Sequence, residues 1–405
     1  MNKQKKAPRL GNVMGGMGTL MASLICIIIG LVVGFVVLLA LGGITLAQSG
    51  NSFSFSELLN TTWQQGFRPI LHGGFYEKAN TMGMGVRMEI LQAAPLIMTG
   101  LSVAFAFKTG LFNIGAAGQY TMGAFFALYS AIMLKLPWWA CLLASAVGGA
   151  IWGAIPGIFK AFLNVNEVIT AIMFNWIGLY AVNTMIYQQG KGPMFNLKTT
   201  KTFTIKEASP DSLLPSFNVN VGGEDYFGKM FRPSIGIFIA IAAAVVIWII
   251  LNKTTFGYEL KACGHNKEAA RYAGINEKKN IVLSMTIAGA LAGLGAGLFY
   301  LSGSKEWEPL VSTALPAAGF NGISVALLAS SNPLGCIFSA LFISHITVGG
   351  GFMFAKLFPS EVADIISGVV IYLCAFSLLF KGSILKLMNK IGTPAQTGKG
   401  KEDKA

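Results

Sequence analysis

The stretch LMASLICIIIGLVVGFVVLLALGGITL, residues 20–46, contains no charged residue. A helix must carry about 20 mostly apolar residues to cross the hydrocarbon core of a bilayer. The stretch satisfies this condition, and a basic head over residues 3–9 precedes it. A cleaved secretory signal is the alternative, but the apolar part of such a signal extends over only about 7–15 residues. We therefore expect an uncleaved first membrane span.

Nine further apolar runs follow this stretch along the chain, and most of them approach the length that a span needs. They predict an all-α integral membrane protein with about ten transmembrane helices. The expected spans lie near residues 20–46, 90–108, 112–134, 138–160, 166–188, 233–252, 280–301, 313–330, 334–351 and 362–381.

The composition of the whole chain agrees with a protein embedded in membrane lipid. Of the 405 residues, 54% are hydrophobic and only 12% are charged, whereas soluble domains carry about 25% charged residues. The formal net charge is +13, but the basic residues flank the apolar runs and form no continuous stripe, so no nucleic-acid partner is expected. The five cysteines show no paired spacing, which predicts neither a disulfide framework nor a metal site.

The distribution of basic residues orients the chain. With ten spans both termini lie on one side, and placing them in the cytoplasm puts 18 of the 30 Lys and Arg residues inside, as the positive-inside rule expects. The predicted organisation is a cytoplasmic basic head over residues 1–19, a transmembrane domain over residues 20–382 and a cytoplasmic basic tail over residues 383–405.

Three longer segments connect the spans. An outer segment at about 47–89 contains an amphipathic piece over residues 53–67, for which we expect a place at the membrane surface. A second outer loop at about 190–232 is either a solvated connector or a surface for a partner. The third segment is an inner loop at about 253–279.

The inner loop gives the strongest functional signal, and it reads FGYELKACGHNKEAARYAGINEKKN over residues 256–280. Asn266 is expected to cap a short helix that starts at Lys267. Glu268 then lies in the first turn, where the helix dipole favours an anion, and Gly274 ends the helix. Small residues leave one side of the helix flat, which suits docking into a groove on another protein; an incidental surface helix is the alternative.

The inner loop resembles the coupling loop of bacterial ATP-binding-cassette (ABC) importer permeases. Glu268, Ala269, Ala270 and Gly274 match the EAA-type signature of the helix that docks on the ATPase in those proteins. The family is the branched-chain amino-acid, ribose and nucleoside group of permeases. The resemblance covers about residues 90–381 and is closest to the longer nucleoside permease subunit that works beside a basic-membrane-protein-type lipoprotein. It is also carried by GLFNIGAAGQ (110–119), NEVITAIMFNWI (166–177) and AAGFNGISVALLASSNPLG (317–335).

The resemblance implies a type II-like ABC importer permease bundle with broken or re-entrant helices, located in the bacterial plasma membrane. It implies three partners: an ABC ATPase subunit, a second permease subunit and a lipid-anchored substrate-binding protein. The solute would be a nucleoside, with a ribose- or galactose-like monosaccharide as the alternative. The residues expected to couple the chain to the ATPase are Asn266, Lys267, Glu268, Ala269, Ala270, Tyr272, Ala273 and Gly274.

Two glycine-rich stretches predict broken helix starts inside the membrane, because irregular backbone survives there only where protein or water covers it. Each contains a Phe-Asn pair, at 112–113 and at 320–321. The two pairs would point in opposite directions, as in an inverted repeat, although coincidence is equally open. Carboxamides can hydrogen-bond a solute without bringing a charge into the membrane. The candidate residues of the translocation pathway are Asn113, Gln119, Asn175, Phe320 and Asn321.

The chain differs from the family pattern at positions 117 and 321. The resemblance implies an acidic residue where this chain has Asn321, and Glu where it has Ala117. Both departures remove a charge, which fits a neutral solute and puts a close transfer of substrate identity in doubt.

Other polar and small residues have structural interpretations. Glu167 is expected to cap a helix start, with a gate contact as the alternative, and His345 is expected to be a structural hydrogen-bonding residue rather than a proton relay. Gly289, Gly293 and Gly297 form a small ridge that lets two helices pack closely.

Two other classes of protein remain as alternatives. The chain has no Walker A sequence, so we expect no ATP hydrolysis, no cofactor and no enzymatic activity in this chain. A secondary transporter driven by an ion gradient would carry ionisable groups in the membrane, and few are present. A structural or lipid-modifying membrane protein would leave the inner helix unexplained.

Overall fold

The computed structural model describes residues 9–48, 54–76, 82–217, 233–311, 313–359 and 361–375. The first eight residues of the basic head and the whole basic tail over 383–405 lie outside the described residues. The described backbone is almost entirely helical, as expected for an all-α protein. Its contacts form two compact units, residues 1–37 with 365–405 and residues 38–364.

The smaller unit contains most of α1 (Arg9–Gln48) and of α15 (Glu361–Ala375). Within it the two helices approach closely at glycines of α1. A Cβ atom at Gly30 would lie 2.6 Å from Val370 Cγ2, and one at Gly34 would lie 2.8 Å from Ile366 Cγ2. The first apolar stretch therefore packs through its glycines against the last helix that the structure describes.

Seven helices among the described residues are long and apolar enough to cross a membrane. The three other predicted runs hold shorter helices: α5 (Ala116–Ile132), α13 (Ala317–Leu328) and α15. The number of complete crossings therefore stays a prediction. The seven long helices are α1, α4 (Met82–Lys108), α6 (Trp138–Leu163), α7 (Glu167–Tyr187), α9 (Gly236–Lys253), α12 (Glu277–Tyr300) and α14 (Pro333–Gly351).

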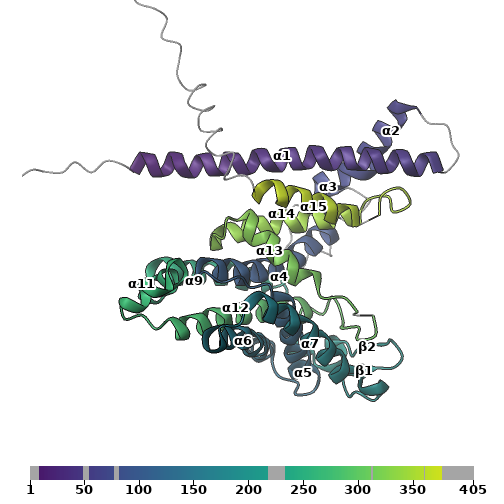
Figure 1. The fold of residues 1–405 in the computed structure, drawn as a ribbon. Coiled ribbons are helices and arrows are strands. Elements are labelled where there is room, and N and C mark those ends of the chain that lie inside the picture. The colour runs from purple at the N-terminus through teal and green to yellow at the C-terminus, as the bar shows by residue number, and fades with distance from the viewer. Residues whose placement is uncertain are drawn as a thin grey trace, which may run out of the picture. The chain divides into compact units, whose positions relative to one another are not determined.

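The connecting segments lie at opposite ends of the larger unit. The inner loop forms α10 (Thr255–His265) and α11 (Lys267–Tyr272). The second outer loop contains η3 (Gln188–Gly190), the antiparallel strands β1 (Phe195–Asn196) and β2 (Lys201–Thr202), α8 (Ile205–Ala208) and η4 (Pro210–Ser212). Figure 1 shows α11 at one end of the bundle and β1 and β2 at the other. This arrangement agrees with the predicted assignment of these loops to opposite sides of the membrane.

The centre of the larger unit is α12, which contacts α6, α4 and α5 (Figure 1). Its crossing with α6 is a contact of backbone against backbone. A Cβ atom at Gly289 would lie 2.3 Å from the Gly149 carbonyl oxygen, and one at Gly293 would lie 2.4 Å from the Ser145 carbonyl oxygen. The close-packing function expected of the glycine ridge is therefore confirmed.

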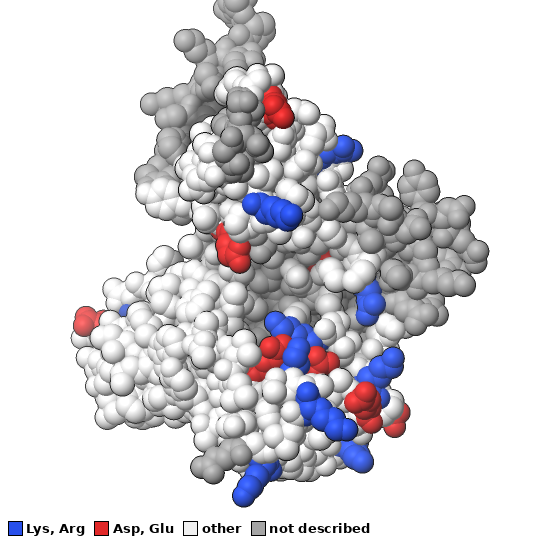
Figure 2. All heavy atoms as spheres, turned by 90° about the vertical axis from the view of Figure 1, so that its right-hand side faces the viewer, with Lys and Arg blue, Asp and Glu red and all other residues white. Residues whose placement is uncertain are grey.

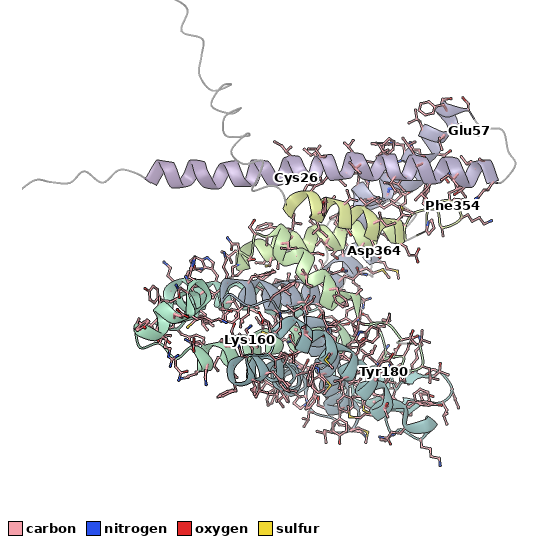
Figure 3. All side chains as sticks on the ribbon, in the orientation of Figure 1. Cys26, Glu57, Lys160, Tyr180, Phe354 and Asp364 are labelled. Atoms are coloured by element: carbon pink, nitrogen blue, oxygen red, sulfur yellow. The ribbon has the colours of Figure 1, made fainter. Side chains whose placement is uncertain are left out.

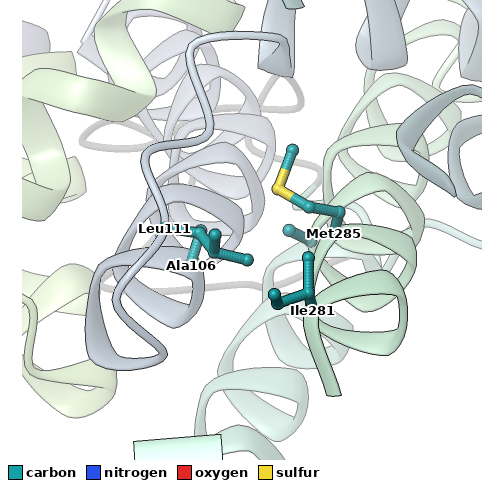
Figure 4. Packing of buried hydrophobic residues seen from close by; sticks show 5 residues of the cluster. Ala106, Leu111, Ile281 and Met285 are labelled. Carbon is teal, nitrogen blue, oxygen red and sulfur yellow. The ribbon is translucent and has the colours of Figure 1, made fainter. Parts of the chain in front are cut away.

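The end of α12 near the inner loop packs on the junction between α4 and α5. Ala106, Leu111, Ile281, Met285 and Ala288 form one buried cluster there, and Figure 4 shows the side chains of the cluster between the two segments. The irregular link that precedes α5 is thus covered by protein, as irregular backbone in a membrane requires.

The amphipathic piece predicted at residues 53–67 is helical where the structure describes it, and its expected place at the membrane surface stays a prediction. It forms α2 (Phe55–Thr61) and a π-helical turn, η1 (Thr62–Phe67), and then continues into α3 (Arg68–His72) and η2 (Gly73–Phe75); residue 53 lies outside the described residues. One side is buried at Leu58, Phe67 and Ile70. The absence of a side chain at Gly66 lets the Phe358 ring approach, so the apolar face packs on protein.

We expect the substitution Gly293→Ala to destabilise the protein strongly. The new methyl group would meet a backbone oxygen, and overpacking of this kind costs about 1–3 kcal/mol. The matched control is Gly351→Ala, because a Cβ atom at Gly351 has nothing within 4 Å. Thermal unfolding of both purified variants measures the difference. Equal unfolding temperatures for Gly293→Ala and wild type would refute the importance of this crossing.

Candidate functional site

The inner helix α11 has the geometry expected from the sequence. The Asn266 Oδ1 accepts a hydrogen bond from the Ala269 amide at 3.0 Å, so Asn266 caps the helix. Gly274 adopts a positive φ of 80°, which ends the helix at low cost. Ala270 is buried against the protein, whereas Glu268 and Ala269 are exposed, and Tyr272 is 94% exposed. An aromatic ring this exposed is a typical contact for a partner protein.

The helix that precedes α11 is tied to the broken-helix region. A Cβ atom at Gly264 of α10 would lie 2.7 Å from the Gly110 nitrogen, so the two backbones touch. Asn280 of α12 donates a hydrogen bond to Cys263 Sγ at 3.6 Å. Thr109 and Ser284 share a further hydrogen bond across the same junction. These contacts join α10 and α12 to the link that leads into α5.

The carboxamides that precede and begin α5 satisfy one another. Asn113 Nδ2 donates to Gln119 Oε1 at 2.8 Å and to Ser102 Oγ at 2.9 Å. Gln119 Nε2 donates back to Asn113 Oδ1 at 3.0 Å. Both side chains are almost fully buried. In this conformation they hold the broken helix start in place, and a contact of Asn113 or Gln119 with solute stays a prediction.

Asn175 of α7 fixes the same helix start from the other side. Its Oδ1 accepts a hydrogen bond from the Gly118 amide at 2.8 Å, and its Nδ2 donates to the Ile114 carbonyl oxygen at 3.0 Å. The side chain therefore supplies partners to backbone groups that α5 cannot satisfy itself. Asn175 contacts the broken start as a support, and its predicted contact with solute is likewise untested.

The two broken helix starts meet each other. A Cβ atom at Gly319 of α13 would lie 2.3 Å from Ala117 Cα of α5, and Ala117 is fully buried. A Glu at position 117, which the resemblance implies for relatives, needs α13 to move away. The small residue at this position is therefore matched to the glycine that faces it.

A cavity of about 440 Å³ lies beside this junction. It is lined by α4, α5, α12 and α13, by Thr347 of α14 and by the outer loop over residues 305–314. Asn321 lines it, whereas Phe320 does not line it and is 39% exposed on the surface of α13. Of the five predicted pathway residues, Asn321 alone lines this cavity. Its lining also includes Gln92 and Tyr120, which the sequence patterns did not single out.

The outer hairpin β1–β2 is fastened to the loop at the mouth of the cavity. The Thr202 amide donates to the Trp307 carbonyl oxygen at 2.9 Å, and the Trp307 amide donates to Thr202 Oγ1 at 3.1 Å. Trp307 Nε1 also donates to Asn183 Oδ1 of α7 at 2.8 Å. The described part of the second outer loop is therefore bonded to Trp307, which lines the cavity, while none of its own described residues lines it.

An ion pair reinforces this contact, with Lys201 Nζ 2.8 Å from Glu308 Oε1. The hydrogen bond from Lys201 lowers the pKa of the Glu308 carboxyl, and Glu308 raises the pKa of the Lys201 ammonium. Figure 2, which views the side that carries the hairpin, shows basic and acidic side chains intermixed on an otherwise largely uncharged surface. The charges near the cavity mouth thus offset one another.

A buried pair that sequence reasoning missed joins α4 to α14. His345 Nδ1 lies 3.1 Å from Glu89 Oε1, and the Gly74 amide donates to Glu89 Oε2 at 3.0 Å. His345 Nε2 lies 3.0 Å from the Leu71 carbonyl oxygen; since a carbonyl only accepts, Nε2 carries a proton. The structural function expected for His345 fits these contacts, but its partner acid comes from another helix, which spacing along one helix does not reveal.

The expectation that Glu167 caps a helix is wrong in one respect. The Asn166 Oδ1 accepts from the Val168 amide at 2.8 Å and is the cap of α7. Glu167 instead forms an ion pair with Lys160 Nζ at 2.9 Å. In Figure 3, Lys160 lies within the bundle, whereas Tyr180 lies nearer the end that carries the hairpin. A shorter Asn side chain reaches the first free amides more readily than Glu does.

The sequence is similar to those of known transport proteins. Residues 87–375 match the family described as branched-chain amino acid transport system, permease component. The chain is 35% identical over 376 residues to the guanosine ABC transporter permease protein NupP of Bacillus subtilis, covering 92% of this chain and 97% of that protein. It is 36% identical over 325 residues to the nucleoside ABC transporter permease protein NupB of Lactococcus lactis, covering 78% and 85%. The glucose ABC transporter permease protein TsgB13 of Haloferax volcanii is 30% identical over 315 residues, covering 76% and 81%.

We expect Glu89→Leu to release the outer segment over residues 70–75. The substitution leaves the buried Gly74 amide and His345 without their acceptor, which costs about 1–3 kcal/mol for each such group. Hydrogen exchange at the Gly74 amide should accelerate and the unfolding temperature should fall. Glu89→Gln keeps an acceptor oxygen and should show a smaller effect. Unchanged exchange in Glu89→Leu would contradict the clamp.

The contact between the hairpin β1–β2 and the loop over residues 305–314 should weaken only at acidic pH. Because Glu308 has a lowered pKa in the folded protein, its ion pair contributes stability above the usual carboxyl pKa of about 4.3. That contribution is lost as the pH falls through the lowered value. Hydrogen-exchange protection of residues 195–203 measures it, relative to the intrinsic rate at each pH. Glu308→Gln should remove the acid-dependent step and the control Glu306→Gln should keep it; the same step in both variants would contradict this assignment.

Proposed function

The chain belongs to the family of branched-chain amino acid transport system permease components, and we propose that it forms one half of the membrane pathway of an ATP-driven importer for nucleosides. It is a multi-pass membrane protein and a transport subunit rather than an enzyme. The observation that carries the proposal is α11, a capped and exposed inner helix whose preceding helix α10 touches the link that leads into α5.

The coupling step follows from these contacts. The exposed Glu268, Ala269 and Tyr272 would lie in a groove of the ATPase subunit. When ATP closes the ATPase, α10 and α11 move together, and Gly264 pushes on the Gly110 backbone. The link between α4 and α5 then moves with α10, and the broken start of α5 follows. ATP itself is bound and hydrolysed by the partner, so this chain needs no cofactor.

The solute class is supported by the relatives. Two of the three relatives described above are named for guanosine or nucleosides and one for glucose. The nucleoside-named proteins are the more similar in sequence, which favours a nucleoside over a monosaccharide. Both solutes are neutral, and the membrane-level lining of the cavity is neutral as well.

The remaining partners complete the pathway. We propose a second permease subunit beside this one, and a lipid-anchored binding protein that delivers solute above the hairpin β1–β2 and the loop over residues 305–314. Both termini would then lie in the cytoplasm, with α11, in a bacterial plasma membrane. A channel of this kind has the ATPase on one side and the solute donor on the other, which is why α11 and the hairpin lie at opposite ends of the bundle.

An ion-coupled secondary transporter is the rival. The pair Glu89 and His345 is an ionisable site of the kind that such proteins use. The two side chains of the pair bond the Gly74 amide and the Leu71 carbonyl oxygen of the outer segment over residues 71–74, and neither side chain lines the cavity. This placement favours a structural function for the pair.

The substitution Glu268→Arg tests the proposal. It places a positive charge at an exposed position in the first turn of α11, so folding should persist while ATPase association and nucleoside uptake fall at least about tenfold, the effect of losing about 1.4 kcal/mol. Co-purification of the ATPase and uptake of labelled guanosine measure the two effects.

The matched control is Glu259→Arg on α10, in the same inner loop but outside α11. It should retain ATPase association and uptake within about twofold. Normal uptake by Glu268→Arg, or uptake by this chain without any ATPase, would reject the coupling function.

A further inference from the structure

The polar groups inside the larger unit fall into two sets. Asn113, Gln119 and Asn175 are hydrogen-bonded to one another or to backbone at 2.8–3.0 Å. Gln92 and Asn321, by contrast, line the cavity and have no hydrogen-bond partner within the described part of the chain. Their donor and acceptor groups are therefore available to a ligand in the cavity.

Two phenol groups belong to the second set. Tyr120 and Tyr300 line the same cavity and are less than a tenth exposed, and within the described residues neither hydroxyl is hydrogen-bonded. Four neutral polar groups from α4, α5, α12 and α13 thus converge on one space. A small number of placed polar groups in a mostly apolar pocket is the usual form of a small-molecule site, and 440 Å³ lies within the usual range for one.

An aromatic wall bounds this space. The rings of Tyr120 and Tyr300 are 6.4 Å apart between centroids, and those of Tyr300 and Trp307 are 5.8 Å apart, both tilted. Phe299 continues the wall from α12. Aromatic surfaces of this kind favour a planar heterocycle through edge and face contacts.

The charges around the cavity exclude other solutes of similar size. Lys305, Glu306 and Glu308 lie in the outer loop at the mouth, and Glu308 is paired with Lys201. One unpaired cation beside one unpaired carboxylate gives no net attraction for a phosphate. Within the membrane the lining has no charged side chain, so a zwitterionic amino acid would lose hydration of both charges without compensation.

We propose that this cavity is a binding site within the permease for one uncharged nucleoside, with the base against the wall formed by Tyr120, Tyr300 and Trp307 and the ribose hydroxyls bonded to Gln92 and Asn321. The proposal rests on the proposed function, because it takes the solute to be a nucleoside. The site receives solute at the outer face before the two broken helix starts separate. It discriminates against nucleotides and free sugars, independently of any selection by an external binding protein.

Equilibrium binding tests the site directly. The complex that co-purifies with this chain is placed in lipid nanodiscs without ATP and without binding protein, and bound tritiated guanosine is measured. We expect saturable binding that unlabelled adenosine or uridine displaces, and that ribose or guanosine monophosphate displaces at least about tenfold less well. Displacement by ribose as effective as by nucleosides would overturn the proposed function of the aromatic wall.

The variants Asn321→Leu and Gln92→Leu should each weaken binding by about threefold to tenfold, since each removes one or two neutral hydrogen bonds. Tyr300→Phe, which keeps the ring, should weaken it less. Phe338→Leu on α14 is the control, because Phe338 is exposed and lies outside the cavity, and it should bind within about twofold of wild type. Size-exclusion profiles verify folding, and wild-type affinity in both leucine variants would overturn the proposal.

The result of the guanosine-binding experiment can be distinguished from a failure of the proposed importer function. ATP-driven uptake of guanosine with no saturable binding to the nanodisc complex would reject the cavity site and leave the importer intact. Loss of uptake in Glu268→Arg with unchanged guanosine binding would support both, because coupling and binding are then carried by different parts of the chain.

Discussion

The contact on which the structure depends is the crossing of α6 and α12, where glycines bring two backbones together without intervening side chains. In lipid there is little hydrophobic drive between helices, so close van der Waals contact of small residues is a main source of association. The crossing fixes α12 as the central helix, and α4 and α5 then pack on its other sides. Gly123 of α5 joins the same contact, because a Cβ atom there would lie 2.4 Å from Gly293 Cα. The short helix α5 is thereby held inside the protein, where its irregular start can be covered.

Polar groups around this core have two functions: some stabilise the broken helix start, and others are available to a ligand. Asn175 supplies hydrogen bonds to a break in the backbone that the membrane cannot satisfy, and Asn113 and Gln119 bond each other beside it. Groups bonded in this way stabilise one conformation of the helix start. Gln92 and Asn321 have the same chemistry but face a cavity. The difference between a supporting carboxamide and one available to a ligand is therefore decided by neighbours, not by residue type.

The inner and outer faces communicate through short contacts. The backbone contact of Gly264 with Gly110 connects the inner loop to the link before α5, and the contact of Gly319 with Ala117 connects α5 to α13. Tyr120, one turn further along α5, reaches the cavity. At the outer end, Thr202 and Trp307 fasten the hairpin to the cavity loop. At the two glycine contacts, backbone meets backbone with no side chain between them.

The sequence by itself determined the membrane class, the helical character of the ten apolar runs, the packing function of the glycine ridge and the capped helix α11, because each depends on residues close together in the chain. It also identified the permease family from four short stretches. Only the tertiary structure decided that Asn166 rather than Glu167 caps α7, that Glu89 is the partner of His345, and that Asn113 is bonded to Gln119 while Asn321 faces a cavity. These outcomes depend on which side chains from distant segments share one space. Hydropathy and spacing describe one segment at a time, whereas hydrogen-bond partners and cavities arise between segments.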